Sequence, residues 1–203
     1  LRNSLVVGAG ATLIATTLGT LAALGLARNT LPCRSFLLAV IISPMIVPVV
    51  ISGVAMYFIF ARVGLVASFG GMILAHAVLG VPFVVVTVTA TLRNFDANLV
   101  KAAYSLGASP VHAFRTVTLP LIAPGVISGA LFAFVFSFDA VVVALFIGGP
   151  AQRTLPRQMF DGIRDNIDPS ILAMSTFLIV VSIALMGTLA LLSRRPGSQA
   201  KTI

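Results

Sequence analysis

The chain has 203 residues, of which 59% are hydrophobic and only 9% are charged, and its formal net charge is +8. In a soluble domain about a quarter of the residues are charged, so this chain has too few charged residues to cover a folded surface in water. We therefore predict an all-α integral membrane protein. The basic residues stand singly between apolar runs, which excludes a nucleic-acid-binding patch.

Five segments are apolar and long enough to cross a bilayer, which takes about 20 residues. In chain order they span residues 4–27, 35–61, 63–92, 123–147 and 170–193. One face of the first segment carries the small residues Ala11, Ala15, Gly19 and Ala23. Small residues allow helix backbones to approach closely, so we predict that this face packs against other spans.

The second segment carries Pro44 and Pro48, four residues apart. Each proline removes a backbone hydrogen bond, so we predict a kink within one span. In transporters, broken helices line the pathway. A pathway role and a packing role for this kink both stay open.

A polar segment separates the third and fourth spans. Lys101-Ala102-Ala103 is followed after three residues by Gly107, and after nine more by Val117-Thr118-Leu119-Pro120. Gly107 suits a left-handed helix stop. Ser109 suits the cap of a second helix, and Pro110 its first position. The pattern predicts two short helices with a joint between them.

The distribution of basic residues orients the spans, because cytoplasmic loops are enriched in Lys and Arg. One set of loops holds Arg28, Arg34, Arg93, Lys101, Arg115, Arg194, Arg195 and Lys201. The opposite set holds Arg2, Arg62, Arg153, Arg157 and Arg164. The first set is larger, so we predict that the polar segment and the C-terminus lie inside. Leu1 then lies outside, and we expect one further span before it.

The loop at 148–169 is predicted to lie outside the membrane and to contain an amphipathic helix. Apolar side chains recur there every four residues, at Leu155, Met159, Ile163 and Ile167. Arg157 and Asp161 are spaced to form an ion pair on one helix face. The helix could act as an interfacial cap or as part of a docking surface.

Two titratable residues fall inside the predicted spans. A carboxylate at mid-bilayer costs roughly 2.5–3.5 kcal/mol, so Asp139 is expected either to attract a cationic substrate or to bond to neighbouring helices. His76 is expected to be a packed hydrogen-bonding group, with a pathway or proton-relay role as the alternative. The predicted pathway residues are Asp139, Phe136, Phe138, Tyr57 and His76. No metal site is expected, because His, Cys and carboxylates lack metal-ligand spacing.

The polar segment resembles the "EAA" motif of the permease subunits of bacterial importers driven by ABC ATPases. Every spacing matches, with Val117 in place of the usual Ile and Lys101 in place of the usual Glu. The resemblance implies a type I ABC importer permease fold over one domain, 1–203, with a cytoplasmic coupling segment at 93–120. In that family the segment docks on the ATPase, so the expected coupling residues are Lys101, Ala102, Ala103, Gly107, Ala108, Ser109, Pro110, Leu119 and Pro120.

The same resemblance implies the partners. They are two ATPase subunits that hold ATP and Mg²⁺, a second permease subunit that is a homologous different chain, and an extracytoplasmic solute-binding protein. The expected location is a bacterial inner membrane. The chain contains no phosphate-binding loop and no catalytic triad, so we expect a transport subunit that is not itself an enzyme and holds no cofactor.

The stretches at 82–88 and 136–150 resemble spermidine/putrescine transporter permeases. Where those proteins have an acidic pair, this chain has Asp139 followed by Ala140. A polyamine is therefore the leading substrate, and amino-acid derivatives, organophosphonates or ferric iron are alternatives. Two rival functions stay open: a secondary transporter that uses Asp139 and His76 as a proton pair, and a membrane scaffold without a pathway.

Overall fold

The computed structural model describes residues 1–27, 31–165, 172–176, 178–181, 183–184 and 187, and the secondary structure assigned to them is helical throughout. Three helices in these ranges are long and apolar enough to span a membrane: α1 (Arg2–Leu26), α4 (Phe69–Arg93) and the continuous run Pro110–Asp139. They correspond to the first, third and fourth predicted spans. The fifth, at 170–193, lies largely outside the described residues.

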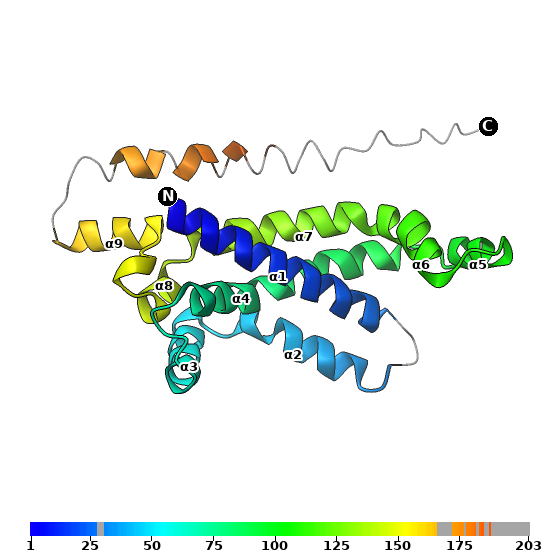
Figure 1. Cartoon of the computed structure of the whole chain (residues 1–203), viewed down its shortest axis with the longest axis horizontal. Helices are drawn as coiled ribbons and strands as arrows, with labels where there is room; N and C mark the ends of the chain where they lie inside the picture. Colours follow the sequence, from blue (N-terminus) through cyan, green and yellow to red (C-terminus); the bar gives the residue numbers. More distant parts are fainter. Residues whose placement is uncertain (28–30, 166–171, 177, 182, 185–186, 188–203) are drawn as a thin grey trace.

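The long helices α1, α4 and α7 (Leu119–Asp139) run side by side and form the centre of the molecule (Figure 1). The predicted small face of α1 is buried, which confirms its packing role. The helices approach so closely that a Cβ atom on Gly19 would lie 2.7 Å from Val84 Cβ, and one on Gly129 would lie 2.8 Å from Val84 Cα. Glycine at both positions is therefore required by the contact.

The second predicted span is broken into two helices, a larger disturbance than the kink that its two prolines predicted. Helices α2 (Arg34–Ile46) and α3 (Val49–Arg62) meet at 105°. The break falls at Val47, which is extended at ψ 132° because the residue before a proline disfavours helical geometry. Pro44 is accommodated inside α2, since the Ser43 hydroxyl donates to the Val40 carbonyl at 2.8 Å, the acceptor that proline leaves open.

The fourth predicted span also differs from the structure at both ends. Its helix starts at Pro110 instead of residue 123, and it stops at Asp139 instead of 147. Ala140 is extended at ψ 99°, and the chain continues as a separate helix, α8 (Val141–Ile147). The turn directs Val143, Ala144 and Ile147 into the core against α4, and this burial favours the break over a straight helix.

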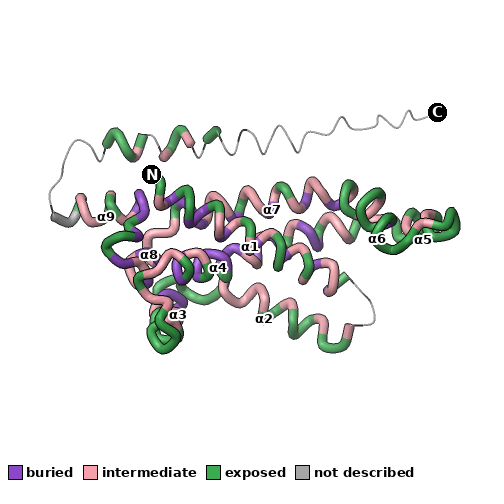
Figure 2. The backbone as a smooth tube through the Cα atoms, viewed as in Figure 1, coloured by how far each residue is buried: buried purple, intermediate pink, exposed green. Residues whose placement is uncertain are grey.

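The remaining short helices gather at the two ends of the bundle (Figure 1). At one end are α5 (Asn98–Ser105) and α6 (Pro110–Ala113). At the other are α8, the 3₁₀ turn Pro150–Gln152, α9 (Leu155–Asp165) and the N-terminus. Figure 2 shows burial along the central helices and exposure along α5 and the start of α6. The predicted inner and outer segments thus lie at opposite ends.

Candidate functional site

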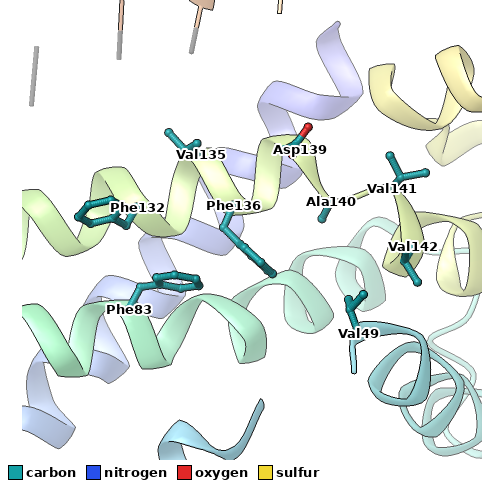
Figure 3. A pocket seen from close by; sticks show the side chains of 9 residues that line it. All are labelled: Val49, Phe83, Phe132, Val135, Phe136, Asp139, Ala140, Val141 and Val142. Carbon is teal, nitrogen blue, oxygen red and sulfur yellow. The ribbon is translucent and has the colours of Figure 1, made fainter. Parts of the chain in front are cut away.

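A cavity of about 480 Å³ lies where α7 ends and α8 begins. Its walls come from α3, α4, α7, α8 and the junction between the last two (Figure 3). The lining residues are Val49, Phe83, Phe132, Val135, Phe136, Asp139, Ala140, Val141 and Val142. The cavity is apolar and aromatic, with a single carboxylate at the helix break.

Asp139 is the last residue of α7, and its side chain is exposed. It forms no ion pair within the described part of the chain, where Arg157 and Asp161 form the pair at 4.0 Å. Figure 3 shows the carboxylate at the rim of the cavity, pointing away from the Phe136 ring.

Aromatic rings form the wall below this carboxylate. Phe83 on α4 and Phe136 on α7 have ring centroids 5.1 Å apart, and both project into the space between the helices (Figure 3). Phe132 lies one turn before Phe136 on the same helix face. Ring faces attract ammonium groups, so this wall is compatible with a cationic solute.

Three predicted pathway residues lie elsewhere. Phe138 is only 6% exposed and stacks on Phe134, with centroids 5.6 Å apart. Tyr57 lies on α3 against Phe58. His76 is 1% exposed, and its Nδ1 atom lies 2.8 Å from the Ser137 hydroxyl oxygen. Of the five predicted residues, only Asp139 and Phe136 line the cavity.

Most of the residues that line this cavity were not predicted from the sequence. Phe132 and Val135 share a helix face with Phe136 and Asp139, so the 3.6-residue period would have found them once Asp139 was chosen. Val49 follows the helix break, and Phe83 lies on another helix. Sequence spacing carries no signal for those two, because the fold brings them to the cavity.

The break in the second span opens onto the same region. A neighbouring hollow of about 320 Å³ is lined by Pro44 to Val49 together with Leu79, Phe83 and Phe136. It shares Val49, Phe83 and Phe136 with the larger cavity. The proline-bearing segment therefore lies beside the larger cavity.

The polar segment has the local geometry that its sequence predicts. Gly107 is left-handed at φ +84°, and the Ser109 hydroxyl accepts a hydrogen bond from the His112 amide at 3.3 Å. Leu106 is 89% exposed, and the Lys101 side chain is also exposed. Between the two helices lies a hollow of about 580 Å³, lined by Ala103, Leu106, Gly107, Ala108, Ser109, His112 and Thr116.

The second predicted short helix is not separate, which corrects the sequence interpretation. From Pro110 the chain is helical without interruption to Asp139, through a π-helical turn at Phe114–Thr118. The turn precedes Pro120, which cannot donate to the carbonyl of Thr116, and the wider helix absorbs this defect. One helix thus carries the joint at its start and the cavity wall at its end.

Apolar helices long enough to span a membrane, with a cavity at a helix break and an exposed polar hinge, are typical of multi-pass membrane transport subunits. Residues 15–197 match the family model described as "Binding-protein-dependent transport system inner membrane component", and the chain belongs to that family. Its fold agrees with a solved structure of the inward-facing MetNI methionine ABC transporter, at a TM-score of 0.73 with 17% identity over 95% of this chain and 94% of that one.

Three curated relatives are similar over most of the chain. The spermidine/putrescine transport system permease PotC of Haemophilus influenzae is 33% identical over 95% of this chain and 75% of its own length. The putrescine transport system permease PotI of Escherichia coli is 36% identical, over 92% and 69% respectively. The molybdenum transport system permease ModB of Mycobacterium bovis is 30% identical, over 86% and 71%.

Proposed function

We propose that the chain forms half of the translocation pathway of an ATP-driven importer for polyamine-like cations. The observation that carries this proposal is the uninterrupted helix from Pro110 to Asp139. It joins the polar hinge to the cavity wall over 30 residues, or about 45 Å at the helical rise.

Coupling would follow from the continuity of that helix, which runs on through the π-helical turn and through Pro124. Motion of a partner bound to the hinge is passed along the backbone to Phe132, Phe136 and Asp139, instead of being absorbed in a loop. Transport requires a pathway with two states whose balance the partner shifts. The Gly107 joint permits α5 to pivot, and the helix beyond it moves as a lever.

The substrate class is argued from the cavity. A carboxylate at the rim of a cavity walled by aromatic rings, without an ion-pair partner among the described residues, favours an ammonium group over an anion. Relatives named for spermidine and putrescine agree with this chemistry, and the relative named for molybdenum is almost as similar, so overall identity alone does not decide the substrate. With Ala140 in place of a second acid, this chain supplies one carboxylate for one ammonium group.

The remaining partners complete the assembly. Two ATPase subunits with ATP and Mg²⁺ would bind at the hinge end, on the cytoplasmic side, where we also place the C-terminus. A second, homologous permease chain would close the open side of the cavity. A solute-binding protein would dock at the outer end near α9, and the membrane would be a bacterial inner membrane.

The decisive experiment purifies the chain with its partner subunits in lipid and adds the binding protein with candidate solutes. We expect spermidine or putrescine to stimulate ATP hydrolysis and to be taken up. Stimulation by a different solute would replace the substrate assignment. Uptake that follows a proton gradient and ignores ATP would contradict the importer and favour the secondary transporter.

A further inference from the structure

The short helix α8 connects the outer end of the molecule to the cavity. Its first two residues, Val141 and Val142, line the cavity, and Val143, Ala144 and Ile147 are buried in the core. It is bounded by the break at Ala140 and by Gly148. Because it has only seven residues, displacement of its carboxyl end must also displace the cavity wall.

The carboxyl end of α8 is held by one arginine. A helix leaves its last carbonyl groups without partners inside the helix. The Nη1 atom of Arg157 donates to the Ala144 carbonyl at 2.9 Å and to the Gly148 carbonyl at 2.6 Å. Its positive charge also complements the negative end of the helix dipole.

The Arg157 side chain is closely packed at this contact. The Arg157 side chain is only 16% exposed, and Asp161 one turn later lies 4.0 Å from its Nε atom. A Cβ atom on Gly148 would lie 2.8 Å from Arg157 Nη1 and 3.3 Å from Met72 Sδ. Gly148 is thus the residue whose lack of a side chain allows the guanidinium to reach the backbone.

The chain just before α9 is tied to a different element. The Asn3 side chain on α1 donates to the carbonyls of Ala151 and Arg153 at 2.9 and 3.0 Å. The Ser4 hydroxyl, also on α1, accepts from the Leu155 amide at 2.7 Å. The base of α9 is therefore fixed to the central bundle, and Arg157 links the helix to α8.

We propose that Arg157 is a positioning residue that couples the outer helix α9 to the cavity wall. When a partner rotates α9 about its own axis, the Arg157 guanidinium carries the carboxyl end of α8 with it and shifts Val141 and Val142. The inference rests on the proposed function, because it requires a binding protein that docks at the outer end. Through Arg157, docking of the binding protein at the outer end would change the position of the cavity wall.

The test uses the complete complex in lipid, with its binding protein loaded with spermidine. Basal ATP hydrolysis and its stimulation by the loaded binding protein are measured for Arg157→Gln, Arg157→Lys and the control Arg153→Gln. Arg153 lies four residues earlier, just before α9, and its side chain is exposed. We expect Arg157→Gln to assemble and to keep its basal rate, while stimulation falls at least tenfold. Arg153→Gln should match the wild type.

Three results would overturn the inference. The first is normal stimulation in Arg157→Gln, and the second is an equal loss in Arg153→Gln, which would indicate a general charge effect. The third is a parallel loss of basal and stimulated rates. If Arg157→Gln does not assemble, Arg157→Lys decides, because lysine keeps the charge but its nitrogen ends one bond short of the Nη1 position. Normal stimulation in Arg157→Lys would show that the two carbonyl contacts of Nη1 are not needed. A wild-type complex without stimulation would instead count against the proposed function.

Discussion

The Nδ1 atom of His76 on α4 lies 2.8 Å from the hydroxyl oxygen of Ser137 and 3.1 Å from its carbonyl oxygen, so one imidazole joins α4 to the last turn of α7. The helix ends two residues later at Asp139, where carbonyl groups lose their intrahelical partners. His76 therefore stabilises the junction that presents Asp139, although it does not line the cavity itself.

Removing this bridge should weaken the fold. We predict that His76→Ala lowers the free energy of unfolding by about 1–3 kcal/mol, because it leaves buried polar groups of Ser137 without a partner. The midpoint of thermal unfolding in detergent measures the effect. His112→Ala is the control, since His112 is exposed and should change stability little. Equal midpoints for the two variants would show that the bridge contributes nothing.

The joint at Gly107 should tolerate alanine better than proline. Its φ of +84° costs an L-residue about 1–2 kcal/mol, whereas proline is locked near −65° and must change the shape of the joint. We predict that Gly107→Pro inserts normally but loses ATP hydrolysis stimulated by substrate. Gly64→Pro is the control, because Gly64 has a similar φ of +70° at the opposite end of the molecule. Stimulation that survives in Gly107→Pro would remove the coupling role.

The charge of Asp139 should matter most for cations. We predict that Asp139→Asn reduces uptake of spermidine roughly tenfold, equivalent to about 1.4 kcal/mol, and reduces uptake of a neutral solute of similar length less. Asparagine keeps the size of the side chain and removes only its charge. Transport assays in proteoliposomes at matched ATP concentration make the comparison. Equal reductions for both solutes would eliminate the electrostatic explanation.

Lys101 reverses the charge found in related motifs, and its exposed ammonium forms no ion pair among the described residues. We predict that the partner ATPase presents an acidic group to it. Lys101→Glu should then weaken ATPase binding about fivefold, or roughly 1 kcal/mol. Affinity measured in detergent at low salt tests this, with Lys101→Ala as the variant that only removes charge. Tighter binding of Lys101→Glu would reveal a basic partner.

Local features of the hinge and of the outer segment were predictable from sequence. The left-handed Gly107, the Ser109 cap and the pair between Arg157 and Asp161 were expected and are confirmed. Each depends on residues within four positions of one another, so the backbone geometry of a single turn determines them. The buried small face of α1 was predictable for a similar reason, because helical periodicity places those residues together.

The interruptions of the spans were not predictable in the same way. Pro48 signalled a disturbance, but the size of the 105° bend depends on packing of α3 against α8. The end of α7 at Asp139 has no proline or glycine to mark it. It arises because turning α8 buries Val143 and Ile147 against α4, a gain that a continuous helix would lose.

The sequence by itself determined the membrane class, the approximate positions of the first and third spans, and the local geometry of the hinge, since apolar length and turn chemistry are properties of contiguous residues. Only the tertiary structure decided that Phe83 meets Phe136, that His76 supports the α7 end instead of lining the cavity, and that Arg157 reaches α8. These contacts join residues on different helices. Their formation depends on how whole helices pack. The spacing of residues along the sequence does not predict which side chains of two different helices come into contact.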